Sequence, residues 1–197
     1  MFTGIVTEVG TVSAVTDGEG LRTFTITAPA TAEGLKVGDS IAVAGVCLTA
    51  VEVADGSFTV EAVPETLSRT TLGAAAAGTA LNLERPMAAS GRFDGHIVQG
   101  HVDGVATVRS VTPEGDSRRI WLDLGARLLP HVVEKGSVTL DGVSLTVTAV
   151  DDAGFEVALI PHTLQVTTLG HLTAGDAVNV ETDVLAKYVE RMLEARS

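Results

Sequence analysis

The sequence predicts an all-β protein of two tandem six-stranded Greek-key-like β-barrels, with a short α-helix at the C-terminal end. Three observations predict it. The 197-residue chain repeats itself at an offset of 97, each copy has the two-residue period of strands, and a helical period is present only after Asp183. We expect an N-terminal barrel over 1–88, a C-terminal barrel over 89–183 and an oligomerisation helix over 184–197.

The repeat is clearest in two segments that align without a gap. Residues 40–49 (SIAVAGVCLT) match 137–146 (SVTLDGVSLT), and residues 64–73 (PETLSRTTLG) match 161–170 (PHTLQVTTLG). About 21 of the 45 positions from 40 to 84 are identical to their partners. A unit of this length is too long for a solenoid repeat and large enough to form a small core of its own. The sequence therefore predicts a duplicated domain.

Within each copy, short strands alternate with turns. Residues 40–53, 57–63 and 80–84 alternate in polarity or run in β-branched residues, separated by Asp-Gly, Gly-Asp or Leu-Gly. Strands at this spacing predict a small barrel, because closure removes the exposed edges. Residues 64–69 and their copy from Pro161 predict one helical turn each, since proline favours the first helical position.

The last segment has a different period. After a linker over 85–92 and the second copy, Asp183 is a candidate N-cap for a helix of about a dozen residues, a length that is marginal in isolation. The apolar positions at helical spacing are Leu185, Tyr188, Val189, Met192 and Leu193. This apolar stripe either packs on another subunit or docks back on its own barrel.

Composition excludes several classes of function. With 25 Asp and Glu against 13 Lys and Arg, the net charge of −12 disfavours nucleic acid and anionic membrane partners. Cys47 is the only cysteine, which excludes internal disulfides and cysteine-clustered zinc sites and fits a reducing cytoplasm. The N-terminal residues carry no signal-peptide pattern, so we expect a soluble, unprocessed, cytoplasmic chain. Phosphate-loop, dinucleotide-binding and His-Glu-x-x-His motifs are missing.

The two copies share a polar pattern and differ in their reactive groups. Repeated Leu-Thr and Pro-x-Thr segments predict one small-molecule pocket built twice. One copy carries a thiol, whereas the other carries a carboxylate, a hydroxyl, an imidazole and an ammonium. The unlike pairs are Ala44 and Asp141, Cys47 and Ser144, Gly38 and Lys135, and, at the offset of 96 that applies nearer the N-terminus, Ile5 and His101. Such pockets suit a reaction in which two molecules of one compound play different roles.

Four motifs give the chain a resemblance to a known family. Residues 1–6 (MFTGIV), 45–49 (GVCLT), 95–104 (GHIVQGHVDG) and 141–146 (DGVSLT) resemble, in this order, the riboflavin synthase α chain family of tandem-repeat lumazine-binding proteins. The resemblance implies a homotrimer that needs no metal or cofactor. It also implies a transferase that dismutates two 6,7-dimethyl-8-ribityllumazine molecules into riboflavin and 5-amino-6-(D-ribitylamino)uracil. The active site would lie between subunits. The resemblance leaves open whether lumazine synthase is a partner.

The resemblance also implies two sets of substrate-binding residues, one in each copy. The first pocket would use Gly4, Ile5, Val6, Cys47, Leu48, Thr49, Glu61, Ala62, Val63, Pro64, Glu65 and Thr66. The second would use Gly100, His101, Val102, Lys135, Ser144, Leu145, Thr146, Ala158, Leu159, Ile160, Pro161, His162 and Thr163.

The candidate catalytic residues each have an alternative role. His101 is a candidate proton carrier, and Ser144, with Asp141 three residues earlier, could supply a nucleophile or orient water. Lys135 could stabilise an anionic ring, or be a solvated loop charge. Cys47 is a catalytic candidate or a small buried hydrophobe, and Asp141 can equally belong to a hairpin turn.

His96 lies five residues before His101, and on an alternating strand an odd spacing puts the two side chains on opposite faces. We therefore expect His96 to be structural. Two rival functions remain beside the enzyme, namely a non-catalytic lumazine or flavin carrier (an antenna protein) and a purely structural barrel module. The retained Leu-Thr and Pro-x-Thr patterns in both copies favour the enzyme.

Overall fold

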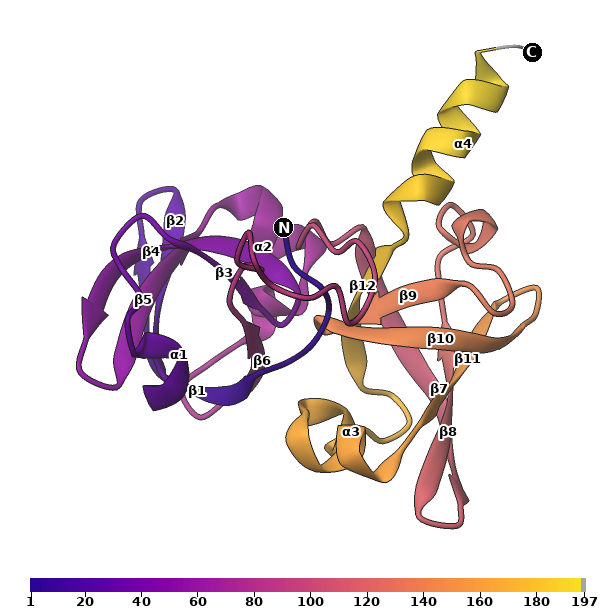
Figure 1. Ribbon diagram of the computed structural model, residues 1–197, viewed down its shortest axis with the longest axis horizontal. Helices are drawn as coiled ribbons and strands as arrows, with labels where there is room; N and C mark the ends of the chain where they lie inside the picture. Colours follow the sequence, from indigo (N-terminus) through magenta and orange to yellow (C-terminus); the bar gives the residue numbers. More distant parts are fainter. Residues whose placement is uncertain (196–197) are drawn as a thin grey trace.

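The computed structural model describes residues 1–195 and confirms two closed six-stranded antiparallel barrels followed by a helix (Figure 1). Neighbouring strands follow the order β1-β2-β5-β4-β3-β6 in the first barrel, and the equivalent order in the second. The first barrel comprises β1 (Glu8–Gly18), β2 (Leu21–Thr27), β3 (Ser40–Val43), β4 (Val46–Ala54), β5 (Ser57–Ala62) and β6 (Ala80–Glu84). The second comprises β7 (Gly104–Glu114), β8 (Ser117–Asp123), β9 (Ser137–Leu140), β10 (Val143–Val150), β11 (Gly154–Leu159) and β12 (Ala177–Thr182).

Each barrel encloses its own apolar core, as expected of a duplicated domain. In β2 the alternating side chains of Phe24 and Ile26 are fully buried, and the equivalent pair in β8 is Ile120 and Leu122. Phe58 in the first barrel corresponds to Phe155 in the second. The two cores are separate clusters, so the period of two in the sequence corresponds to one inward-facing row per strand.

Short helices connect the strands at equivalent places in the two barrels. The predicted helical turns form α2 (Pro64–Arg69) and α3 (Pro161–Val166), each starting at its proline, and each is followed by a 3-10 turn, at Thr71–Ala74 and Thr168–His171. The first barrel also contains the short helix α1 (Pro29–Ala32), and the 3-10 turn Leu129–His131 takes its place in the second.

The two barrels contact each other through their equivalent hairpin turns. Ala44 and Asp141, the first residues of these turns, have positive φ values of 47° and 43°. A β-carbon on Gly45 would lie 2.7 Å from the backbone nitrogen of Gly142, so a larger residue there would force the turns apart. Two-residue turns of this kind favour glycine at their second position.

Asparagine side chains join the barrels across this junction. Asn82 of β6 donates to the carbonyl of Asp141 (3.0 Å) and accepts from the amide of Thr168 (2.9 Å). Asn179 of β12 makes the equivalent contacts. It donates a hydrogen bond to the carbonyl of Ala44 (2.9 Å) and accepts one from the amide of Thr71 (2.7 Å). Both asparagines are buried, so these bonds satisfy groups that water does not reach.

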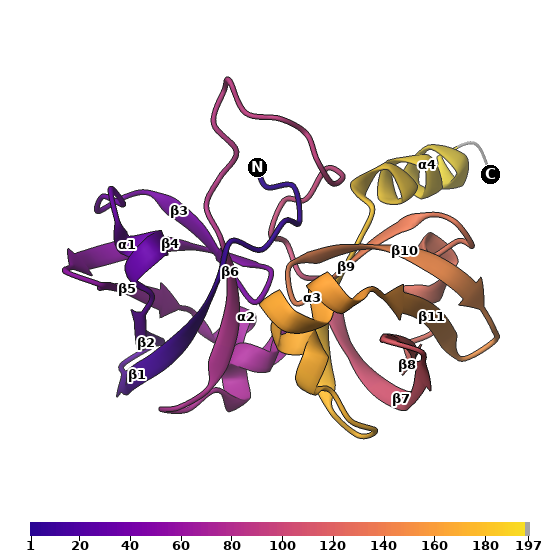
Figure 2. The same ribbon diagram turned by 60° about the horizontal axis from the view of Figure 1, so that its bottom comes forward.

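In Figure 1, helix α4 (Val184–Glu194) extends beyond the second barrel, and ion pairs of Lys187 with Asp103 and of Glu190 with His131 connect it to the second half of the chain. Asp183 caps it, because its carboxylate accepts from the amide of Leu185 at 2.9 Å, as predicted. The stripe residues Leu185, Tyr188, Val189, Met192 and Leu193 are each at least 51% exposed. Within residues 1–195, none of the helices has the length and apolar character needed to cross a membrane. A long loop connects β6 to β7 and lies beside the N-terminus (Figure 2).

Candidate functional site

Two short arms cross the junction between the barrels. We call residues 2–7, which precede β1, the first arm, and residues 98–103, which precede β7, the second arm. In the first arm, the carbonyl of Gly4 accepts from the amide of Ser144 in the second barrel (2.8 Å). In the second arm, the carbonyl of Gly100 accepts from the amide of Cys47 in the first barrel (2.8 Å). Each arm therefore lies against the reactive strand of the opposite barrel.

Glycine is required at both crossing points. Gly4 and Gly100 have φ values of +79° and +77°, which favour glycine. A β-carbon on Gly4 would lie 2.6 Å from the β-carbon of Ser144, and one on Gly100 would lie 2.6 Å from that of Cys47. The repeated Gly-x-Val sequence thus marks the closest approach of each arm to its strand.

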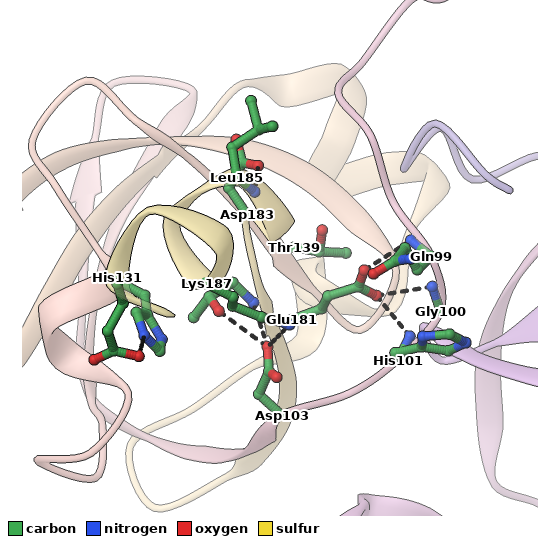
Figure 3. Close-up of polar contacts among 12 residues, drawn as sticks. Gln99, Gly100, His101, Asp103, His131, Thr139, Glu181, Asp183, Leu185 and Lys187 are labelled. Carbon is green, nitrogen blue, oxygen red and sulfur yellow. Dashed lines mark hydrogen bonds and ion pairs between the residues drawn. The ribbon is translucent and has the colours of Figure 1, made fainter. Parts of the chain in front are cut away.

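A buried glutamate holds each arm by its backbone. Glu181 of β12 accepts from the amides of Gln99, Gly100 and His101 at 2.7, 2.8 and 2.9 Å (Figure 3). Glu84 of β6 likewise accepts from the amide and hydroxyl of Thr3 and from the amide of Gly4. Burial raises the pKa of both carboxyls, although the bonds from backbone amides partly offset it.

The crossing of the arms corrects the predicted grouping of the site residues. From the sequence, Gly4, Ile5 and Val6 are predicted to lie with Cys47, and His101 with Ser144. The structure places the first arm against Ser144 and packs Val6 on the core of the second barrel. It places the second arm against Cys47 and packs Val102 on the core of the first. The grouping was wrong because an internal repeat identifies equivalent residues but does not show which copy they contact.

A pocket of about 430 Å³ lies where the second arm meets the first barrel. It brings together six predicted substrate-binding residues, Cys47, Glu65, Thr66, Gly100, His101 and Val102. The other five lining residues were not predicted from the sequence: Val46, Arg69, Thr70, Asp103 and Arg127. The thiol of Cys47 is partly buried and the imidazole of His101 is exposed, so polar groups from both halves of the chain face one cavity.

Other predicted binding residues lie in different surroundings. Leu48 and Ala62 are buried in the first core and Leu159 in the second, while Leu145 packs on the second core. Ala158 and Thr163 are partly buried. Besides Glu65, His101 and Lys135, the exposed members of the predicted set are Ile5, Thr49, Glu61, Val63, Pro64, Thr146, Ile160, Pro161 and His162. Within residues 1–195, His, Cys, Asp and Glu side chains form no group of three that could hold a metal ion.

Ser144 pairs with a histidine that the sequence analysis set aside. The Nδ1 atom of His96 lies 2.7 Å from the Ser144 hydroxyl, and its Nε2 atom lies 3.2 Å from the hydroxyl of Thr139 (β9). Burial lowers the pKa of His96, an effect that the charge of Asp183 partly opposes, and this favours the neutral imidazole. The strand assumed for residues 95–103 is an irregular segment with a single bridge from Val98 to Phe2, so the argument from odd spacing does not apply.

Among the described residues, neither Asp141 nor Lys135 hydrogen-bonds with its side chain to Ser144 or His96. The Asp141 carboxylate accepts from the amide of Asn179 at 2.8 Å, at the junction of the barrels. Burial raises the pKa of Asp141 to about 7. Lys135 occupies an exposed turn with a φ of +65°. Asp141 instead occupies the hairpin turn that was its alternative role, and its carboxylate bonds to the backbone of β12 within the second barrel.

Replacing Asp141 should stabilise the chain at alkaline pH. A carboxyl whose folded pKa is raised to about 7 from 3.8 contributes stability below pH 4 and loses it as pH rises through 7. We expect Asp141→Asn to match the parent near pH 4 and to exceed its free energy of unfolding by roughly 2–4 kcal/mol at pH 8. Urea unfolding across this range measures the difference. The exposed Asp152→Asn is the control and should not change this pH dependence, and an Asp141→Asn chain that is less stable at pH 8 would refute the prediction.

Comparisons with known proteins show which proteins the chain is similar to. A family model described as lumazine binding domain matches residues 3–86 and again 99–183. The chain is 46% identical to a riboflavin synthase of Mycobacterium tuberculosis, over 99% of both chains. It is 43% identical to that of Actinobacillus pleuropneumoniae, over 98% of this chain and 90% of the relative. Crystal structures of LumP complexed with riboflavin and with 6,7-dimethyl-8-(1'-D-ribityl) lumazine superpose with TM-scores of 0.85 and 0.84, at 28% and 25% identity. Both cover 92% of this chain and 99% of the other.

Proposed function

The chain belongs to the lumazine-binding family, and from that premise we propose how its two pockets carry out the riboflavin synthase reaction. The enzyme dismutates two molecules of 6,7-dimethyl-8-ribityllumazine and transfers a four-carbon unit from one to the other. One molecule becomes riboflavin and the other 5-amino-6-(D-ribitylamino)uracil. Unlike reactive groups at equivalent positions of the two repeats match a reaction in which identical substrates play unlike roles.

The observation that carries the proposal is the crossing of the arms, which gives each barrel a different set of groups. The Cys47 strand receives His101 from the second arm, while the Ser144 strand receives Ile5 from the first arm and His96 from the linker. Two lumazines held in such pockets can be distinguished chemically. One can lose a proton from its C7 methyl group while the other accepts a nucleophile at C7.

We assign nucleophile activation to the pair of Ser144 and His96. With the proton of the neutral imidazole on Nε2 and directed to Thr139, the Nδ1 atom is free to accept from the Ser144 hydroxyl. A hydroxyl bonded to a neutral base is the arrangement that activates a serine or an adjacent water. His101 is the candidate proton carrier in the opposite pocket, with Cys47 beside it, and Lys135 would stabilise anionic charge on the ring.

We further propose that the reaction needs more than one subunit. The two lumazines must meet face to face, and the active site would form between the N-terminal barrel of one subunit and the C-terminal barrel of its neighbour. Support comes from α4, whose apolar stripe is exposed, and from a groove of about 710 Å³ between this helix and residues 130–137. A neighbouring α4 would fill this groove in a homotrimer. The proposal places the enzyme in the cytoplasm, with lumazine synthase as a candidate partner.

A single incubation tests the activity. Given 6,7-dimethyl-8-ribityllumazine and no added metal or cofactor, the chain should produce riboflavin, followed by its absorbance, and an equimolar amount of the uracil product. A chelator should not change the rate. A tightly bound lumazine that is never converted would instead support the carrier function, which the likeness to LumP makes the second candidate. If the chain bound no ribityl pteridine, a purely structural barrel module would be the only one of the three functions left.

A further inference from the structure

Helix α4 contacts the second arm, the segment that carries His101 into the pocket beside Cys47. The ammonium group of Lys187 in α4 lies 2.6 Å from the carboxylate of Asp103, the last residue of this arm (Figure 3). The two side chains are 28% and 18% exposed, so water and salt screen this ion pair less than one at the open surface. Asp103 also lines the pocket. An ion pair therefore connects the helix to one edge of the pocket.

The same carboxylate holds the end of the arm on β12. The Oδ2 atom of Asp103 accepts from the amide of Thr182 at 2.8 Å and from its hydroxyl at 3.0 Å. The residue before it, Glu181, accepts from the amides of residues 99–101. Burial raises the pKa of Glu181, and the charge of Lys187 is among the effects that oppose this rise. One lysine therefore stabilises the ionised form of both carboxylates that hold the arm.

The first arm has no equivalent of this ion pair. At the offset of 96, Asp103 corresponds to Thr7, whose hydroxyl donates to the carbonyl of Leu83 at 3.2 Å. The first arm contains no charged residue, and a linker follows its barrel where α4 follows the second. The ionic contact is thus specific to the arm that carries His101, whereas the arm that carries Ile5 is held by neutral donors alone.

We infer that Lys187 is a positioning residue that acts through Asp103 to keep His101 in its pocket. Without the ammonium group, the Asp103 carboxylate would be partly buried with no cation beside it, and its movement toward water would draw the end of the arm away from β12. The inference rests on the proposed function, in which His101 carries a proton. It gives α4 a role within each chain in addition to its contact with a neighbour. Lys187 does not line the groove between α4 and residues 130–137, so its replacement leaves that groove intact.

The thiol of Cys47 reports the position of the arm in the full chain. It is the only cysteine, and its amide donates to the carbonyl of Gly100 in the arm at 2.8 Å, so an arm that opens more often exposes the thiol more often. We expect Lys187→Met to react with iodoacetamide, an uncharged reagent, about five- to tenfold faster than the parent. Lys187→Arg keeps the charge and should restore a rate close to that of the parent.

Glu190→Gln is the matched control for the labelling experiment. It removes the other ion pair that connects α4 to the second barrel, between Glu190 and His131 at 2.7 Å, and this pair does not involve the arm. The labelling rate of Glu190→Gln should therefore equal that of the parent. A lysine that only fastened the helix to the barrel would instead give the same result in both variants.

Turnover tests whether Lys187 acts through His101. Lys187→Met should lower kcat about five- to tenfold in the parent and scarcely at all in His101→Gln, because the position of the arm no longer matters once the imidazole is absent. The inference is overturned if Lys187→Met is labelled at the parental rate, if Glu190→Gln is labelled as fast as Lys187→Met, or if the two losses of kcat multiply. None of these results bears on whether riboflavin forms. If the parent forms no riboflavin, the proposed function fails, while the labelling rates still decide whether the lysine holds the arm.

Discussion

A chain carrying Val189→Glu and Met192→Glu should be a monomer that has lost nearly all turnover. Both side chains are more than half exposed in the single chain, so the charges do not disturb either barrel core. In an assembly, however, glutamates would be buried on the apolar stripe without partners. Holding two reactants in a fixed orientation is worth roughly 7–11 kcal/mol, so we expect turnover to fall by a factor of about 10³ or more. Sedimentation equilibrium and steady-state assays measure the two effects.

Binding separates this loss from a folding defect. The cavity beside Cys47 is formed by one chain, so the monomeric variant should bind riboflavin with about the affinity of the parent and unfold at about the same temperature. Arg191→Gln is a matched control, because this α4 residue is exposed and does not line the groove. A monomer with parental turnover would show that both lumazines meet within one chain, and would refute the proposed active site between subunits.

The sequence predicted the architecture because each barrel repeats the same local signals. The inward residues of β2 and β8, the prolines that start α2 and α3, and the Asp183 cap all follow from short-range rules, and the structure contains each of them. The alternation of strands requires no knowledge of the partner strand. Local physical chemistry therefore determines the elements, whereas each barrel closes through the long-range pairing of its first and last strands.

The assignment of residues to pockets could not be predicted in the same way. Gly4 and Gly100 occupy equivalent positions, and either could in principle contact Cys47 or Ser144. The choice depends on how the two barrels pack, which rests on long-range bonds such as those of Asn82 and Asn179 across the junction. The repeated Asn-x-Glu sequence was a visible signal of these bonds and of the glutamates that hold the arms. Its meaning depends on backbone amides and carbonyls, which have no sequence signature.

His96 is the residue whose predicted role differs most from its position in the structure. A strand was assumed through residues 95–103, and on a strand His96 and His101 would face opposite ways. The segment is irregular because it is not held by a continuous strand ladder. Hydrogen bonds to Glu181 and the single bridge from Phe2 to Val98 hold it instead. Both histidines therefore lie next to candidate site residues, His96 beside Ser144 and His101 in the cavity beside Cys47.

The pairing of His96 with Ser144 makes a quantitative prediction for catalysis. Ser144→Ala removes the hydroxyl and His96→Gln removes the base, and we expect each change to lower kcat by about 10²–10³-fold, the range typical of a positioned acid or base. The double variant should be scarcely slower than either single variant, because one group has no role without the other. His171→Gln, an exposed histidine away from Ser144, serves as the control and should keep parental activity.

The pH profile tests whether His96 acts as the base in that pair. Because burial lowers the pKa of His96, the neutral imidazole persists below the pH at which an exposed histidine is protonated. The acid limb of kcat in the parent should therefore fall below pH 6.5, and it should disappear from the residual activity of His96→Gln. Losses that multiply in the double variant, or an acid limb that survives in His96→Gln, would mean that the two side chains act independently. Ser144 would then contribute only by orienting the substrate, and the nucleophile at C7 would have to be activated by another group.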